Sequence, residues 1–155
     1  YIIQKATELG ASKILPIVTE RTITKSLNLK RLQDIAIEAS EQCERITIPE
    51  IFPLQKLYDV IDTWGDKRTI YYADETMRHE KQSTNNFNKL IKATSGAILV
   101  GPEGGFTMKE KSYLKQKKFI IPINFGQRIL KSDTAVITGL VFWQTLNGDM
   151  KTIFN

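Results

Sequence analysis

The chain has 155 residues, 41% of them hydrophobic and 25% charged, with a formal net charge of +5. This length suits one globular domain, and no apolar run approaches the roughly 18 residues that a membrane-spanning helix needs. Cys43 and His79 are the only residues of their types, which excludes an internal disulfide and a structural metal site built from Cys and His. The low cysteine content fits a reducing, cytoplasmic location.

The first third of the chain predicts two helices with a strand between them. Residues 1–9 have the pattern of a helix body, and Gly10 is typical of a helix end. Residues 13–18 are mostly apolar and predict a strand. In residues 29–42 the apolar positions recur at helical spacing, which predicts a second helix.

The predicted elements in the middle of the chain are shorter. Residues 46–48 predict a brief extended piece, and Pro53 suits the opening of a helix over residues 54–64. Residues 69–73 are β-branched and aromatic and predict a strand. The polar residues 74–86 predict a loop.

Helices and strands continue to alternate in the second half. Thr107 and Glu110 have the spacing of a capping box, which predicts the start of a helix that runs to about residue 117. The other predicted elements are a short helix at 87–93, strands at 97–100 and 119–124, a loop at 125–128 and a final helix from Ser132 or Asp133.

This alternation predicts an α/β domain, a parallel sheet with helices on both faces. Ligands of such sheets bind at the carboxyl ends of the strands. Three predicted strand ends are therefore candidate binding segments, at residues 73–74, 101–106 and 124–130.

The segment Gly101-Pro102-Glu103-Gly104-Gly105-Phe106 follows one of these strands. Its glycines and proline indicate a tight turn with unusual backbone dihedral angles. Its backbone N–H groups, next to a helix start, suit a carboxylate, phosphate or ribose hydroxyl, although a plain strand-to-helix turn explains the composition equally well. The spacing matches neither the phosphate loop of nucleoside triphosphatases nor the dinucleotide-binding motif.

Positive charge gathers in the second half, where residues 78–155 carry 12 basic and 5 acidic side chains. Such a balance suits a phosphate-bearing partner but also a solvated surface. Arg128 and Lys131 precede the final predicted helix, at the end where the helix dipole disfavours cations. They indicate an anion site there, or an exposed pair without a role.

Several segments together resemble the RsmE family of ribosomal RNA methyltransferases, which belongs to the knotted SPOUT class. They are residues 5–10, Glu20-Arg21, residues 38–42, residues 101–106, and Arg128-Ile129-Leu130 with Thr134-Ala135. The resemblance covers nearly the whole chain. The sequence departs from the family at Thr22, Lys131 and Asp133, where members usually carry Ser, Arg and Glu. Lys131 therefore lacks the planar, two-pronged contact that Arg makes with phosphate.

The resemblance implies a C-terminal deep trefoil knot, a homodimer, and S-adenosylmethionine-dependent methylation of uracil N3 in 16S ribosomal RNA of the small subunit, without metal or membrane. It also implies that residues 1–155 form one catalytic domain and that the family's N-terminal RNA-binding, PUA-like domain is absent from this chain. Residues 134–146 are apolar almost all round, which predicts a helix buried on two sides, one of them against a second copy.

The resemblance also implies roles for individual residues. Arg128 is expected to stabilise the anion of the target uracil, and Glu103 either to accept the N3 proton or to cap backbone N–H groups of the turn. RNA contacts are expected at Arg21, Arg45 and Lys131. The implied cofactor-binding residues are Ala73, Leu99, Val100, Gly101, Pro102, Glu103, Gly104, Gly105, Asn124, Phe125, Gly126, Arg128, Ile129 and Leu130.

Other functions remain compatible with these residues. A related knotted methyltransferase would act on a different nucleotide. An α/β enzyme that uses the glycine segment for phosphate would bind nucleotides in preference to S-adenosylmethionine. A non-catalytic RNA-binding α/β module would bind RNA with a steep salt dependence and would take no cofactor.

Overall fold

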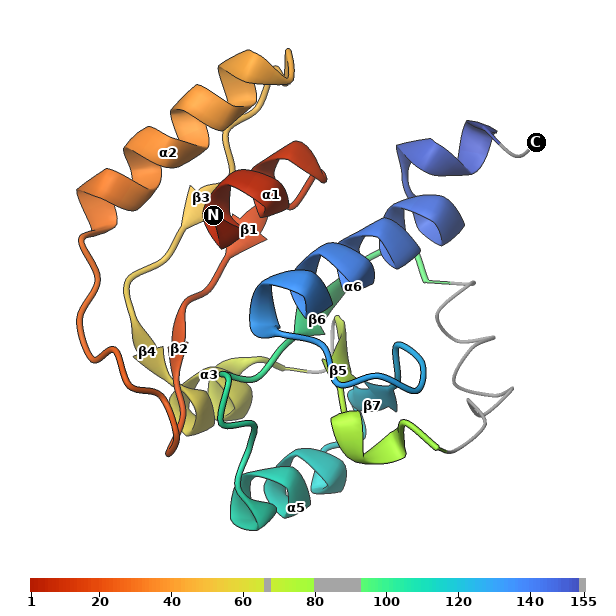
Figure 1. Cartoon of the computed structure of the whole chain (residues 1–155). Helices are drawn as coiled ribbons and strands as arrows, with labels where there is room; N and C mark the ends of the chain where they lie inside the picture. Colours follow the sequence, from red (N-terminus) through yellow and green to blue (C-terminus); the bar gives the residue numbers. More distant parts are fainter. Residues whose placement is uncertain (66–67, 80–92, 154–155) are drawn as a thin grey trace.

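Three parallel strands form the central sheet of the protein (Figure 1). The computed structural model describes residues 1–65, 68–79 and 93–153. Strand β5 (Thr69–Ala73) lies in the middle, between β6 (Gly96–Leu99) and β7 (Ile120–Ile123). In this register Tyr71 pairs with both Ile98 and Ile121. Because both pairings are parallel, the carboxyl ends of all three strands meet at one edge of the sheet.

Helices cover both faces of this sheet, as the alternation of elements predicts. Side chains alternate along β5, so Ile70 and Tyr72 belong to one buried cluster and Tyr71 to another. Helices α3 (Leu57–Thr63) and α5 (Met108–Gln116) pack on the Tyr72 face. Helix α6 (Ser132–Asn147) covers the Tyr71 face with Trp143 and Leu146.

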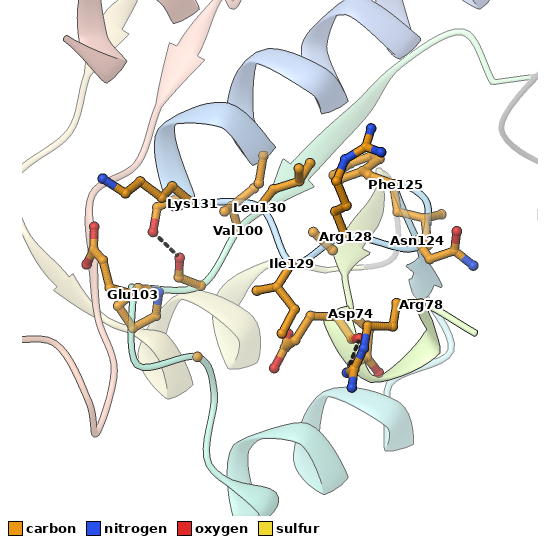
Figure 2. A pocket seen from close by; sticks show the side chains of 18 of the residues that line it. Asp74, Arg78, Val100, Glu103, Asn124, Phe125, Arg128, Ile129, Leu130 and Lys131 are labelled. Carbon is orange, nitrogen blue, oxygen red and sulfur yellow. Dashed lines mark hydrogen bonds between the residues drawn. The ribbon is translucent and has the colours of Figure 1, made fainter. Parts of the chain in front are cut away.

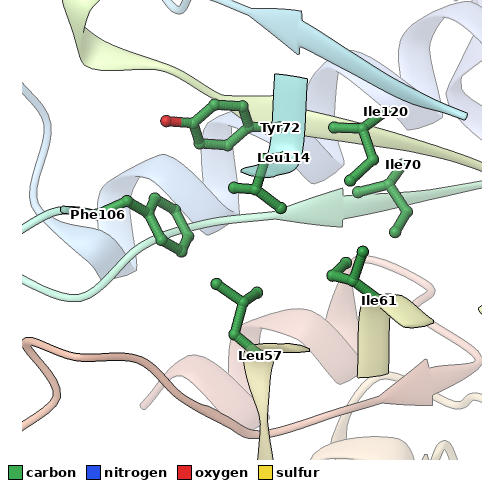
Figure 3. Packing of buried hydrophobic residues seen from close by; sticks show 7 residues of the cluster. All are labelled: Leu57, Ile61, Ile70, Tyr72, Phe106, Leu114 and Ile120. Atoms are coloured by element: carbon green, nitrogen blue, oxygen red, sulfur yellow. The ribbon is translucent and has the colours of Figure 1, made fainter. Parts of the chain in front are cut away.

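The larger cluster joins the sheet to α3 and α5 (Figure 3). Leu57 and Ile61 of α3, Leu114 of α5 and Phe106 meet β5 at Tyr72, where the Phe106 and Tyr72 rings make an edge contact with centroids 5.3 Å apart. Leu114 and Tyr72 are fully buried. The glycine-rich turn and α5 are therefore anchored to the sheet by apolar packing.

The first 56 residues form two helices and two small parallel sheets beside α6. Helix α1 packs against both α2 and α6. Gly10 ends α1 with a φ of 82°, as the sequence predicts. The elements are α1 (Ile2–Glu8), α2 (Leu29–Gln42), the pair β1 (Lys13–Ile14) with β3 (Glu50–Ile51), and the pair β2 (Ile17–Val18) with β4 (Gln55–Lys56).

Three predicted elements in this region are wrong in detail. Residues 13–18 form two strands, because Leu15-Pro16 interrupts the run and the two halves pair with different partners. Pro53 precedes β4, and the helix begins only at Leu57, because residues 55–56 extend to pair with β2. Residues 46–48 form no strand, and the strand here is β3, two residues further along the chain.

The predicted elements of the second half agree with the structure wherever the structure describes them. The capping box of Thr107 and Glu110 opens α5, and α6 begins at Ser132. Glu75–Met77 form a short 3-10 helix, η1, within the predicted loop, and Asp149–Ile153 form a second, η2. Residues 80–86 of that loop and most of the predicted helix at 87–93 lie outside the described residues, and the knot stays a prediction. No helix in the described residues is both long and apolar enough to cross a membrane.

Candidate functional site

An open cleft of about 450 Å³ lies at the carboxyl edge of the central sheet (Figure 2). This volume falls in the range of small-molecule binding sites. The segments that follow β5, β6 and β7 supply its walls, together with the start of α6. The lining residues are Ala73, Asp74, Glu75, Arg78, Val100, Gly101, Pro102, Glu103, Gly104, Gly105, Ile123, Asn124, Phe125, Gly126, Arg128, Ile129, Leu130, Lys131, Ser132 and Ala135.

The glycine loop, residues 101–105, turns sharply after β6. The Gly105 N–H donates to the Pro102 carbonyl at 2.8 Å, and Gly105 has a φ of 65°, which favours glycine. A Cβ atom at Gly101 would lie 2.8 Å from the Phe106 ring, so a larger residue there would displace the ring from the core. The loop therefore requires glycine both for its conformation and for its close packing.

Arg21 supports the glycine loop from the N-terminal part of the chain. Its Nη1 donates to the Gly104 carbonyl at 2.8 Å. A Cβ atom at Gly104 would lie 3.2 Å from the Cβ of Arg21, so the arginine stem and the loop backbone are in close contact. The exposed Arg21 side chain is thus part of the outer support of the cleft.

The loop after β7, residues 124–131, closes the other side of the cleft. Asn124 donates from Nδ2 to the Met77 carbonyl at 3.2 Å and accepts the Gly126 N–H at Oδ1, also at 3.2 Å. Ser132 Oγ donates to the Gly101 carbonyl at 3.0 Å, which joins this loop to the glycine loop. The Phe125 and Phe142 rings lie 6.1 Å apart, which attaches the loop to α6.

A cluster of charged side chains around the buried Asp74 borders the cleft at the end of β5. The Asp74 side chain has no exposed surface, and its Oδ1 accepts the Thr76 backbone N–H at 3.1 Å and the Thr76 hydroxyl at 2.7 Å. Lys115 lies 3.3 Å from Asp74 Oδ2, and Lys111 lies 2.7 Å from Glu75 Oε1. Two lysines of α5 therefore hold the acidic end of β5 in place.

The pKa of Asp74 reflects these contacts. Burial alone would raise the pKa, because it disfavours the charged carboxylate. The two hydrogen bonds from Thr76 and the positive charge of Lys115 outweigh burial and hold the pKa of Asp74 below its usual value. Asp74 is therefore ionised in the folded protein at neutral pH.

Comparison with known proteins gives a family for this fold and cleft. The model of the RNA methyltransferase domain matches residues 1–144. The chain belongs to the RNA methyltransferase domain family. The match includes all three strands and the whole lining of the cleft.

Individual relatives agree with this family. Ribosomal RNA small subunit methyltransferase E of Rickettsia conorii is 37% identical over 141 residues, which cover 89% of this chain and 55% of that protein. The enzyme of the same name from Buchnera aphidicola subsp. Schizaphis graminum is 35% identical over 158 residues, which cover 97% of this chain and 61% of that protein. The chain thus spans 55–61% of the length of these two relatives.

A solved structure has the same fold. The crystal structure of Ribosomal RNA small subunit methyltransferase E from Neisseria gonorrhoeae, bound to S-adenosyl methionine, matches with a TM-score of 0.81. It is 31% identical in sequence, and the match covers 94% of this chain and 60% of that one. The α/β fold with a parallel sheet and helices on both faces is therefore shared with a methyltransferase.

The RNA methyltransferase domain brings most of the expected site residues together. Of the residues expected to bind a cofactor, all but Leu99 line the cleft, and Leu99 packs against the cluster of Figure 3. Glu103 and Arg128 lie on opposite sides of the cleft (Figure 2). Lys131 also lines it. Arg45 is not among the lining residues and donates from Nη1 to the Thr7 carbonyl at 2.8 Å.

The sequence analysis did not single out two charged residues of the cleft, Glu75 and Arg78. Asp74 also lines the cleft and was expected there only as part of the strand end at 73–74. Their position just after the predicted strand at 69–73 was the one sequence feature that could have indicated a place in the site. Within the described residues, no group of three His, Cys, Asp or Glu side chains is arranged to hold a metal ion.

We predict that Asp74→Asn lowers the free energy of unfolding at pH 7 by about 2 kcal/mol, because it removes a buried charge that accepts two hydrogen bonds from Thr76 and forms an ion pair with Lys115. The folded pKa of Asp74 lies below its unfolded value, so its stabilisation is present above about pH 4 and is lost as the pH falls through the folded pKa. Urea denaturation across pH 3–7 measures both effects.

The exposed Asp149 provides the matched control. Asp149→Asn should change stability by less than about 0.5 kcal/mol at every pH. If Asp74→Asn and Asp149→Asn behave alike at pH 7, the charge cluster does not stabilise the fold.

Proposed function

We propose that this chain is one catalytic domain that binds S-adenosylmethionine and methylates ribosomal RNA of the small subunit, in the cytoplasm, with uracil N3 as the target atom. The observation that carries the proposal is the cleft at the carboxyl edge of the sheet, bounded by a glycine loop, in a domain of the RNA methyltransferase family. The names of the relatives above support small-subunit ribosomal RNA as the substrate class. The Neisseria gonorrhoeae structure, with its bound S-adenosyl methionine, supports the choice of cofactor.

The composition of the cleft fits this cofactor. Val100, Ile123, Leu130 and Ala135 supply apolar surface for the adenine ring, and the glycine loop lets the backbone approach a ribose or carboxylate closely. Glu103 supplies negative charge toward the sulfonium and ammonium groups, whereas Asp74 and Glu75 are paired with Lys115 and Lys111.

We assign the individual contacts as follows. The loop of residues 101–105 holds the ribose and the amino-acid part, and residues 124–130 surround the adenine. Ala73 completes the wall at the end of β5. The bond from Ser132 to the Gly101 carbonyl keeps the two loops at a fixed separation, which supports their joint role.

The chemistry demands little of the protein beyond orientation and electrostatics. S-adenosylmethionine supplies an activated methyl group when it is bound. The protein must place the uracil ring in line with that group and stabilise the negative charge that develops when N3 loses its proton. Arg128, an exposed cation at the edge of the cleft, is suited to stabilise this charge. Glu103 lies on the opposite side of the cleft, and we assign it the role of accepting the proton that N3 loses.

RNA contacts follow from the positive side chains near the cleft. Lys131 lines the cleft and Arg21 lies beside the glycine loop, so both can reach a phosphate next to a bound base. Arg45 follows α2, donates to the Thr7 carbonyl of α1 and does not line the cleft, so its proposed RNA contact lies outside the cleft. A base in a duplex has its N3 paired, so the target nucleotide must be single-stranded or turned out of its stack.

We further propose that the protein acts as a homodimer through α6. Val141 is 37% exposed and Phe142 is 44% exposed on this largely apolar helix. In a dimer, a second copy would cover such a surface.

Sedimentation tests the dimer. The wild type should sediment at twice the mass of one chain, and Phe142→Glu should shift it toward the monomer, because it places a charge in an apolar interface. Lys118→Glu, an exposed change in the turn after α5, is the control and should stay dimeric. A wild type that is monomeric at tens of micromolar would contradict the dimer.

The catalytic role of Arg128 is tested by separating binding from transfer. Arg128→Ala should lower methyl transfer to small-subunit ribosomal RNA by about 100-fold or more, because it removes the charge that stabilises the anion. Its affinity for S-adenosylhomocysteine, measured by calorimetry, should remain within about threefold of the wild type, because the two loops still hold the ligand.

Arg31→Ala is the control, since this exposed arginine of α2 does not line the cleft and lies outside both loops assigned to the cofactor. This control should retain both methyl transfer and the affinity for S-adenosylhomocysteine. Normal transfer by Arg128→Ala would remove Arg128 from the mechanism. Wild-type binding of ATP but not of S-adenosylhomocysteine would contradict the proposed function itself.

A further inference from the structure

Glu110 is a fully buried carboxylate that lies outside the cleft. Its side chain sits at the start of α5, and none of its surface is exposed. Within the part of the chain that the structure describes, no lysine or arginine forms an ion pair with it. Burying an unpaired carboxylate has a high free-energy cost unless hydrogen bonds satisfy both oxygens.

Both oxygens of Glu110 accept a backbone N–H. Oε2 accepts from Thr107 at 2.8 Å, which is the capping-box bond, and Oε1 accepts from Glu20 at 2.8 Å. A capping box needs only one acceptor, so glutamine would serve the helix equally well. Two N–H partners require two acceptors, and only a carboxylate provides them because the amide nitrogen of glutamine is a donor.

The second bond connects α5 to the outer support of the glycine loop. Glu20 directly precedes Arg21, whose guanidinium donates to the Gly104 carbonyl at 2.8 Å and whose stem packs against Gly104. The first bond fixes Thr107, where the loop runs into α5. One carboxylate therefore fixes the exit of the loop and, through Arg21, its middle.

We infer that Glu110 is a positioning residue for the cofactor loop, acting through the Glu20 N–H and Arg21 on Gly104. The inference rests on the proposed function, since it takes the glycine loop as the site that holds the cofactor. Capping explains the bond to Thr107 but not the bond to Glu20, which joins segments 90 residues apart.

The test compares a variant that breaks the double connection with a variant that weakens only the helix cap. Glu110→Gln places an amide N–H against one of the two backbone N–H groups, so the double connection is lost. Thr107→Ala removes the hydroxyl that accepts the Glu110 N–H and leaves both carboxylate bonds in place. Both should lower the melting temperature, but only Glu110→Gln should weaken S-adenosylhomocysteine binding, by about tenfold as measured by calorimetry.

Arg21→Met is a second test variant. It removes the hydrogen bond to the Gly104 carbonyl by changing an exposed side chain, so the fold should remain stable. It should weaken S-adenosylhomocysteine binding, and its effect should not add to that of Glu110→Gln, because both act on the same loop carbonyl. In transfer assays, Glu110→Gln should raise KM for S-adenosylmethionine and leave kcat within about twofold.

Either of two results would overturn the inference. One is Glu110→Gln binding S-adenosylhomocysteine as tightly as Thr107→Ala does. The other concerns Arg21→Met: either wild-type affinity of this variant for S-adenosylhomocysteine, a result that does not depend on whether Glu110→Gln folds, or full additivity of its effect on affinity with that of Glu110→Gln. Failure of the wild type to bind S-adenosylhomocysteine is a different outcome, because it contradicts the proposed function before any variant is compared.

Discussion

The parallel pairing of β5 with both β6 and β7 is the constraint on which the site depends. With Tyr71 in register with Ile98 and Ile121, the three strands end at the same edge of the sheet. Residues from positions 73 to 135 of the chain therefore meet around one cleft. A slip of one residue in β5 would exchange the two faces of the strand and place Tyr72 on the wrong side of the sheet.

The loops at this edge are held by contacts between distant segments of the chain. Ser132 reaches back to Gly101, Arg21 reaches forward to Gly104, and Lys115 pairs with the buried Asp74. The cleft is thus fixed before a ligand arrives, which lowers the entropy cost of binding.

Local patterns were sufficient for most of the fold. The helix at 29–42, the capping box at Thr107 and the strand at 69–73 follow from spacing and residue type, which act over a few residues. The split at Leu15-Pro16 depends on which strands pair, so the sequence run alone could not predict it. The Asp74 cluster was missed for the same reason. Lysines on a helix have the pattern of a solvated surface, and only the tertiary fold brings Lys111 and Lys115 to β5.

The most direct measurement is the change in backbone amide chemical shifts when S-adenosylhomocysteine is titrated into the protein. If the three strand-end loops form the cofactor site, the largest saturable changes should fall at Ala73, residues 101–105 and residues 124–130, while α2 on the far side of α1 stays unchanged. Changes that centre on α2, or no saturable changes in a folded sample, would contradict the assignment of this cleft to the cofactor.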